Sequence, residues 1–117
     1  MSLIPEQWAF LQDVGRLIEE IGFTGFYASI GDAYRCREYQ DILIAKGVSW
    51  TYNSRHLSRL AVDINIFTSI DPTVYATASE VIPTVGRFWE SLNEKNIHSL
   101  RKGDDDKDLF HFERKIG

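Results

Sequence analysis

The chain has 117 residues, a net charge of −4, and 44% hydrophobic and 13% aromatic residues. This length suffices for one compact core, so we expect a single domain over residues 1–117. The composition excludes a disordered chain, and a negative charge without a basic stripe argues against nucleic-acid binding.

We expect neither a disulfide nor a membrane segment. Cys36 is the only cysteine, so an internal disulfide cannot form. The N-terminus has no basic start followed by an apolar run, and no apolar segment approaches the ~20 residues that span a bilayer. These features predict a protein that is made in the cytoplasm without a signal peptide and is not inserted in a membrane.

The first half of the chain predicts two helices and one strand. Residues 3–21 have helical periodicity, with Pro5 in the first turn and Gly22 at the end. The predicted apolar stripe of this helix is Trp8, Leu11, Val14, Ile18 and Ile21. Its predicted solvent-exposed polar face is formed by Glu6, Asp13, Arg16, Glu19 and Glu20. A short strand follows at residues 26–30, and a second helix at residues 37–46.

The second half predicts three strands and one helix. Residues 60–67 alternate as a strand, and residues 68–77 are expected to be irregular with a turn at Asp71-Pro72. A helix over residues 83–95 has the apolar stripe Val85, Phe88, Trp89 and Leu92. Residues 97–101 and 109–115 are two further strands, joined by a hairpin connection at 103–106. The fold class is therefore α+β, with a small antiparallel sheet flanked by helices.

Two strands place polar side chains opposite their apolar faces. Asp63 lies on the face away from Leu60, Val62, Ile64 and Ile66, and an acid in such a strand is costly to bury without a partner or a metal. His111 and Glu113 alternate with Phe110 and Phe112 in the last strand. If the two strands share one sheet, Asp63 and His111 converge, and His56 can reach them from the preceding loop.

Two imidazoles and one carboxylate around an open position are typical of a catalytic zinc site on one sheet face. Such a site needs a general base, for which Asp108 and Glu113 are candidates. It also needs an electrophile for the developing oxyanion, for which Arg35 is the candidate.

Each residue also has a structural interpretation. His56 can be a loop hydrogen-bonding residue, Asp63 can pair with an arginine, and His111 can be a hydrogen-bonded strand histidine. His98 has no acidic or histidine neighbour at ligand spacing, so we expect it to be structural. The run Asp104–Asp106 lacks the spacing of a calcium loop and predicts a solvated turn.

Three ordered motifs resemble one enzyme family. Ser54-x-His56-x-x-x-x-Ala61-x-Asp63 resembles the S-x-H-x-x-G-x-A-x-D signature of zinc metallopeptidases that include D-alanyl-D-alanine carboxypeptidases, VanX-type dipeptidases and phage L-alanyl-D-glutamate endolysins. The segment 108–113, Asp-Leu-Phe-His-Phe-Glu, resembles the D-x-P-H-F-E end motif of the phage members. Tyr34-Arg35 and Gln40 resemble their YR-T/S-x-x-x-Q segment.

The resemblance implies a role for each matched residue. His56, Asp63 and His111 match the zinc ligands. Asp108 matches the general base, with Glu113 as the second candidate, because alternation places Glu113 on the face of His111. Arg35 matches the arginine that binds substrate and stabilises the transition state, and Ser54 matches a serine in contact with substrate or ligands.

The implied protein is a zinc-dependent peptidoglycan hydrolase resembling a phage endolysin. Its substrate would be the bacterial stem peptide, most directly the L-alanyl-D-glutamate bond, reached after release from the host cytoplasm. We expect a monomer. The alternatives are a D-alanyl-D-alanine carboxypeptidase or dipeptidase, and a non-catalytic module that binds wall peptides or a protein. A third is an enzyme that uses Cys36 as nucleophile.

The chain departs from the family pattern at three places. Arg59 replaces the glycine of the signature, so either the backbone is ordinary there or the side chain narrows the cleft. Phe110 replaces the proline of the end motif, which a strand tolerates. Residues 97–107 lack the tryptophan-glycine pair expected ahead of that motif, which bears on substrate specificity.

Overall fold

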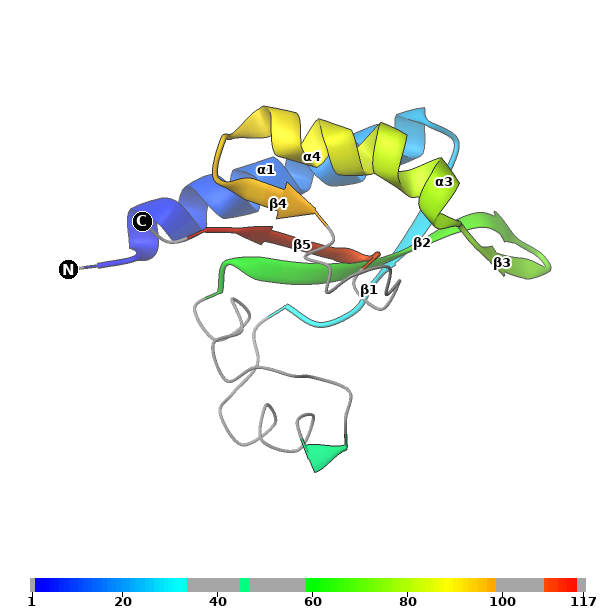
Figure 1. Ribbon diagram of the computed structural model, residues 1–117, viewed down its shortest axis with the longest axis horizontal. Helices are drawn as coiled ribbons and strands as arrows, with labels where there is room; N and C mark the ends of the chain where they lie inside the picture. The colour runs from blue at the N-terminus through cyan, green and yellow to red at the C-terminus, as the bar shows by residue number, and fades with distance from the viewer. Residues whose placement is uncertain (1, 34–44, 47–58, 99–108, 116–117) are drawn as a thin grey trace.

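The structure is a computed structural model that describes residues 2–33, 45–46, 59–98 and 109–115. One layer of helices covers one face of an antiparallel sheet (Figure 1). The strands lie in the order β1 (Tyr27–Ile30), β2 (Ala61–Ile70), β5 (His111–Arg114) and β4 (Asn96–His98). β3 (Thr73–Tyr75) pairs with the far end of β2. The expected α+β fold with a small antiparallel sheet is confirmed.

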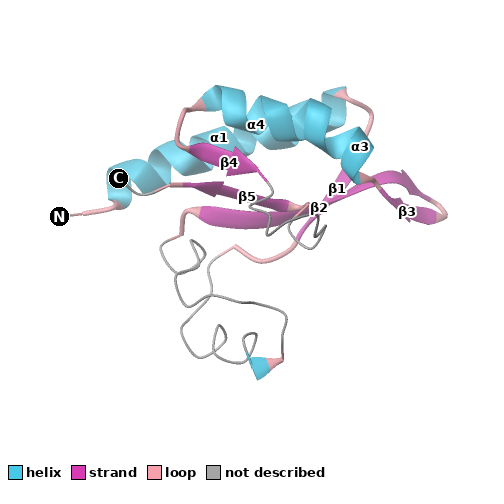
Figure 2. Ribbon diagram, in the orientation of Figure 1, coloured by secondary structure: helices cyan, strands magenta, loops and turns pink. Residues whose placement is uncertain are grey.

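The helical layer consists of α1 (Ile4–Phe23) and a second helical segment. That segment runs through α3 (Ala78–Val81), the π-helical turn η2 (Ile82–Gly86) and α4 (Arg87–Leu92). Both lie on the same side of the sheet (Figure 2). No helix in the described part of the chain is long and apolar enough to cross a membrane. The predicted helix at 37–46 lies outside the described residues, apart from 45–46.

The predicted alternation of the central strand is confirmed. Leu60, Val62, Ile64 and Ile66 are buried under the helices, whereas Asp63 and Asn65 point to the opposite face and are partly exposed. The strand is longer than predicted, and most of the segment 68–77 is not irregular. Residues 68–70 complete β2 and residues 73–75 form β3, which pairs with it across the predicted turn at Asp71-Pro72.

The helix predicted at 83–95 is displaced at both ends. It begins at Ala78, because Thr77 and Glu80 form a capping box in which Glu80 Oε1 accepts the Thr77 backbone N–H at 2.9 Å. It ends at Leu92. Val85 and Trp89 of the predicted stripe are fully buried, and Trp89 packs edge-on against Phe10 and Phe112.

The predicted end of α1 is wrong. Gly22 lies inside the helix, which ends at Phe23 with Thr24 as its C-cap and is followed by Gly25, where φ is +85°. The Gly25 N–H donates to the Gly22 carbonyl and the Phe26 N–H donates to the Ile21 carbonyl, each at 3.1 Å. This pair of bonds is a Schellman motif, whose left-handed residue favours glycine.

The predicted burial of α1 is only partly correct. Val14 and Ile21 are buried together with Phe10 and Leu17, but Trp8, Leu11 and Ile18 of the predicted stripe are exposed. The helix carries two apolar stripes of the same period, and the packing selects the one next to Asp13. Asp13 itself was predicted to lie on the solvent-exposed polar face, but it is buried.

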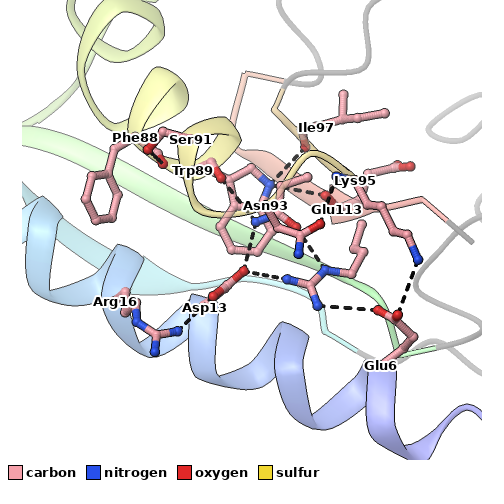
Figure 3. Close-up of polar contacts among 12 residues, drawn as sticks. Glu6, Asp13, Arg16, Phe88, Trp89, Ser91, Asn93, Lys95, Ile97 and Glu113 are labelled. Carbon is pink, nitrogen blue, oxygen red and sulfur yellow. Dashed lines mark hydrogen bonds and ion pairs between the residues drawn. The ribbon is translucent and has the colours of Figure 1, made fainter.

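Asp13 is buried because β5 supplies a buried guanidinium. Arg114 Nη2 donates to Asp13 Oδ2, and Arg114 Nε donates to Asn96 Oδ1 at 3.0 Å. Asn96 Nδ2 in turn donates to Asp13 Oδ2 at 3.1 Å, and Arg16 donates to Asp13 Oδ1 at 2.8 Å. Figure 3 shows Glu6 and Asp13 projecting from α1 into this cluster. The network ties the first helix to the last strand.

This network predicts a large effect of Asp13→Ala on stability. Removal of the carboxylate leaves the Arg114 guanidinium, which is 1% exposed, without its principal counter-charge. We expect the free energy of unfolding to fall by about 3–5 kcal/mol, measured by urea denaturation followed by circular dichroism. The matched control is Glu19→Ala on the exposed side of the same helix, which should change it by less than ~0.5 kcal/mol. Equal effects of the two substitutions would contradict this role of the buried pair.

Candidate functional site

The site begins with the pairing of β2 and β5. Asp63 and His111 are directly opposite in the antiparallel register, as are Val62 and Phe112. Because opposite residues share a face, Val62 and Phe112 enter the core while Asp63 and His111 meet on the other side of the sheet. The predicted convergence of Asp63 and His111 is therefore confirmed.

Asp63 and His111 are in direct contact. Asp63 Oδ1 lies 3.0 Å from His111 Nδ1, and Glu113 Oε1 lies 2.7 Å from His111 Nε2. The imidazole is thus held between two carboxylates that stand on its own face of the sheet. The Glu113 side chain is the most buried of the three, at 6% exposure, compared with 16% for His111 and 26% for Asp63.

The residues that follow β1 hold the backbone of Asp63 on the edge of β2 opposite to β5. The Gly31 N–H donates to the Asp63 carbonyl at 2.7 Å, and the Asp63 N–H donates to the Asp32 carbonyl at 2.6 Å. A Cβ at Gly31 would lie 3.0–3.1 Å from Asp63 atoms. Gly31 therefore permits a close approach that any side chain would crowd, a role that was not predicted from the sequence.

The charges around His111 control its protonation. Burial of the ring disfavours the imidazolium, but hydrogen bonds and negative charge from Asp63 and Glu113 outweigh it and raise the pKa of His111 to about 9. Without a metal, the site is therefore an imidazolium between two carboxylates at neutral pH.

The donor atoms also suit a metal ion. When His111 donates Nε2–H to Glu113, Nδ1 carries the lone pair that a metal requires. The 3.0 Å between Nδ1 and Asp63 Oδ1 is close to the ~3.3 Å between two donors of tetrahedral zinc with bonds of ~2.0 Å. In zinc sites, the ring nitrogen of a histidine ligand that does not bind the metal usually donates its N–H to a carboxylate. Glu113 occupies this position at His111 Nε2.

Most of the other predicted site residues lie outside the described part of the chain. They are Arg35, Ser54, His56 and Asp108. Within residues 2–33, 45–46, 59–98 and 109–115, no three His, Cys, Asp or Glu side chains are grouped to hold a metal. The described part of the chain thus supplies two of the three predicted ligands, Asp63 and His111.

His98 is structural, as expected from its neighbours in the sequence. Its ring is buried against Phe112, and Nε2 hydrogen-bonds to the Leu109 carbonyl. A Cβ at Gly86 would lie 2.3 Å from His98 Nδ1, so η2 can pass this ring only with glycine at position 86.

Arg59, which replaces the signature glycine, has a left-handed backbone with φ of +58°. Of the two alternatives for this position, an ordinary backbone is therefore excluded. The turn that leads into β2 keeps the conformation that favours glycine, although this chain places an arginine there.

The left-handed turn predicts an inverted order of stability at position 59. A protein with alanine at a given position is normally more stable than the same protein with glycine there. In the left-handed conformation, however, the Cβ is unfavourable. The free energy of unfolding of Arg59→Gly should therefore exceed that of Arg59→Ala by about 1 kcal/mol. The comparison of these two variants removes the contribution of the arginine side chain itself. The control is position 87 in α4, where Arg87→Ala should be more stable than Arg87→Gly by about 1 kcal/mol. The same order at both positions in urea denaturation would contradict the left-handed assignment.

The raised pKa of His111 predicts a pH dependence of the metal-free protein. The folded-state value of about 9 lies above the ordinary value of 6.5, so this stabilisation is complete below pH 6.5 and is lost as the pH rises to about 9. In chelator-treated protein, the free energy of unfolding should fall by a few kcal/mol over this range.

The control for this prediction is His111→Gln, which should flatten the profile. An NMR titration of the wild-type ring should give a pKa near 9, and Asp63→Asn should lower it. A wild-type value near 6.5 would show that the two carboxylates do not hold the imidazolium.

The comparisons with known proteins show a likeness at the level of fold. No family model and no curated protein matches the sequence. The crystal structure of the L-Ala D-Glu endopeptidase ChiX from Serratia marcescens matches with a TM-score of 0.63 and 19% sequence identity. The match covers 89% of this chain and 79% of that chain. The two proteins therefore share a fold over most of their lengths.

Proposed function

We propose that this chain is a zinc-dependent peptidase of the bacterial cell wall, most directly one that hydrolyses the L-alanyl-D-glutamate bond of the stem peptide. The observation that carries the proposal is the contact of Asp63 with His111, backed by Glu113. The fold shared with ChiX, an L-Ala D-Glu endopeptidase, supports the same substrate class.

Three residues would hold the zinc ion: His56, Asp63 and His111. Zinc, when bound, lowers the pKa of a water molecule and polarises the substrate carbonyl. Glu113 would fix the tautomer and orientation of His111, since its carboxylate accepts the Nε2–H. In the metal-free protein, Asp63 and Glu113 keep a proton on His111. When zinc displaces the Nδ1 proton, Asp63 would bind the metal and Glu113 would orient the imidazole.

The proton transfers of the reaction fall to Asp108. Asp108 accepts the proton of the attacking water as its oxygen bonds to the amide carbon, and it returns that proton to the nitrogen as the C–N bond breaks. Arg35 would stabilise the negative charge on the carbonyl oxygen, and Ser54 would contact the substrate. These three assignments rest on the resemblance of the motifs.

Glu113 was the second candidate for the base, and its geometry favours the orienting role. Its Oε1 is already engaged with His111, and the side chain is 6% exposed. A general base must reach the attacking water, which requires an accessible carboxylate. This leaves Asp108 as the base in our proposal.

The proposal predicts about one zinc ion per chain and cleavage of purified peptidoglycan. Mass spectrometry of the digested muropeptides should show new termini at the L-alanyl-D-glutamate bond. His56→Ala should lose both zinc and cleavage, because two ligands hold the metal poorly. Activity that survives in the metal-free protein would contradict the proposal, and release of D-alanine instead would identify a D-alanyl-D-alanine peptidase.

Two further substitutions separate the roles of the carboxylates. Asp108→Asn should keep zinc and lower turnover by about 10²–10⁴-fold. Glu113→Gln should weaken zinc binding by about 10–100-fold and recover much of its turnover at saturating zinc. Asp104→Asn, in the same acidic segment as Asp108, is the matched control and should change neither. An opposite pattern for Asp108 and Glu113 would exchange their roles.

A further inference from the structure

Helix α1 carries a second apolar stripe on its outer side. Ile4, Trp8, Leu11 and Ile18 are exposed to 68%, 59%, 58% and 52%, and none belongs to the buried core. With Gly15 and Gly22, which are also exposed, the stripe advances in steps of four and three residues along the whole helix. This spacing is that of the a and d positions of a helix that packs against another helix.

The two glycines of the stripe have no explanation in the packing of the described residues. Among these residues, a Cβ added at Gly15 or Gly22 would meet no atom within 4 Å, and neither glycine has a positive φ. Neither residue ends the helix, since the Schellman turn is at Gly25. Glycine inside a helix is unfavourable relative to alanine, so both positions weaken α1 without a benefit to its own packing.

We infer that two copies of the chain associate through this stripe, with their α1 helices antiparallel about a two-fold axis. One register pairs every position. Leu11 lies opposite the partner's Gly15, Ile4 lies opposite the partner's Gly22, and Trp8 lies opposite the partner's Ile18. Two of the three pairs bring a bulky side chain against a glycine, so the missing side chains accommodate the partner's Leu11 and Ile4.

The size and charge of the stripe fit this association. A helix of 20 residues is about 30 Å long, and pairing over this length buries on the order of 1,000 Å² in total, the lower limit for a specific interface. Two acidic side chains of α1, Glu6 and Asp13, point away from the stripe, because they bind Arg114 of β5. The dimer is therefore predominantly apolar and of modest affinity.

The association is independent of the proposed peptidase function. α1 lies on the helical side of the sheet, whereas Asp63 and His111 lie on the opposite face (Figure 1). Loss of the dimer should leave the zinc content and the cleavage of peptidoglycan unchanged, so failure of one proposal is distinguishable from failure of the other. The inferred dimer replaces the monomer expected from the sequence.

The test is the mass of the full chain in solution, by analytical ultracentrifugation over about 1 µM to 1 mM. We expect the mass to rise toward twice the 13.5 kDa of one chain. Gly15→Leu should remain at one chain, because its side chain meets the partner's Leu11. The double variant Leu11→Gly with Gly15→Leu exchanges the two members of the pair and should restore the dimer. The control Glu19→Gln, off the stripe, should dimerise as the wild type does.

Circular dichroism of Gly15→Leu should show a folded protein, since a Cβ at position 15 meets no atom of residues 2–33, 45–46, 59–98 or 109–115 within 4 Å. A wild-type mass of one chain throughout the concentration range would overturn the inference. So would a dimer that Gly15→Leu leaves intact, because the association would then use another surface. A dimer strengthened by Gly15→Leu would show parallel helices and refute the antiparallel register.

Discussion

The antiparallel pairing of β2 with β5 is the constraint on which both the core and the site depend. Residues 48 positions apart, Asp63 and His111, become direct neighbours through it. The same register brings Val62 opposite Phe112 on the inner face. Because side chains alternate along each strand, one set of backbone hydrogen bonds aligns an apolar pair with the core and a polar pair with the outer face.

The end of β5 is fixed by charge as well as by backbone pairing. Arg114 follows Glu113 and points toward the helical layer, where Asp13 of α1 and Asn96 of β4 hold its guanidinium. The Trp89 indole N–H is shared between the carbonyls of Ile97 and Glu113, at 3.2 and 3.1 Å. Glu113 is thus held through its backbone on one side and contacts His111 with its side chain on the other. A rigid supporting strand of this kind is what a metal site requires.

The surfaces on the two sides of the sheet have different physical characters. The face opposite the helices carries the polar group Asp63, His111 and Glu113, where the proposed chemistry would take place. The outer side of α1 is apolar and carries two glycines that the helix itself does not need. Separation of the two surfaces by the core would allow the inferred association and the proposed catalysis to proceed without mutual interference.

The amino-acid sequence by itself determined the features that depend on local period. The two-residue alternation identified the buried face of β2 and placed Asp63, His111 and Glu113 on the other face. Turn-forming residues identified the turn at Asp71-Pro72, and helical spacing identified the stripe around Trp89. These features were predictable because each depends on neighbours a few residues apart in the chain.

Only the tertiary structure decided between alternatives of equal period. Both apolar stripes of α1 are compatible with a helix, and the buried one is that beside Asp13, whose partner Arg114 is 101 residues away. The close approach of Gly31 to Asp63 likewise depends on how distant segments meet. The left-handed backbone of Arg59 is seen only in the structure. The contact of Glu113 with His111 is decided by side-chain orientation on β5, where alternation gives the face but not the partner. The buried stripe of α1 and the approach of Gly31 share one physical reason, since burial, close packing and charge pairing are energies of contact between segments that local sequence does not bring together.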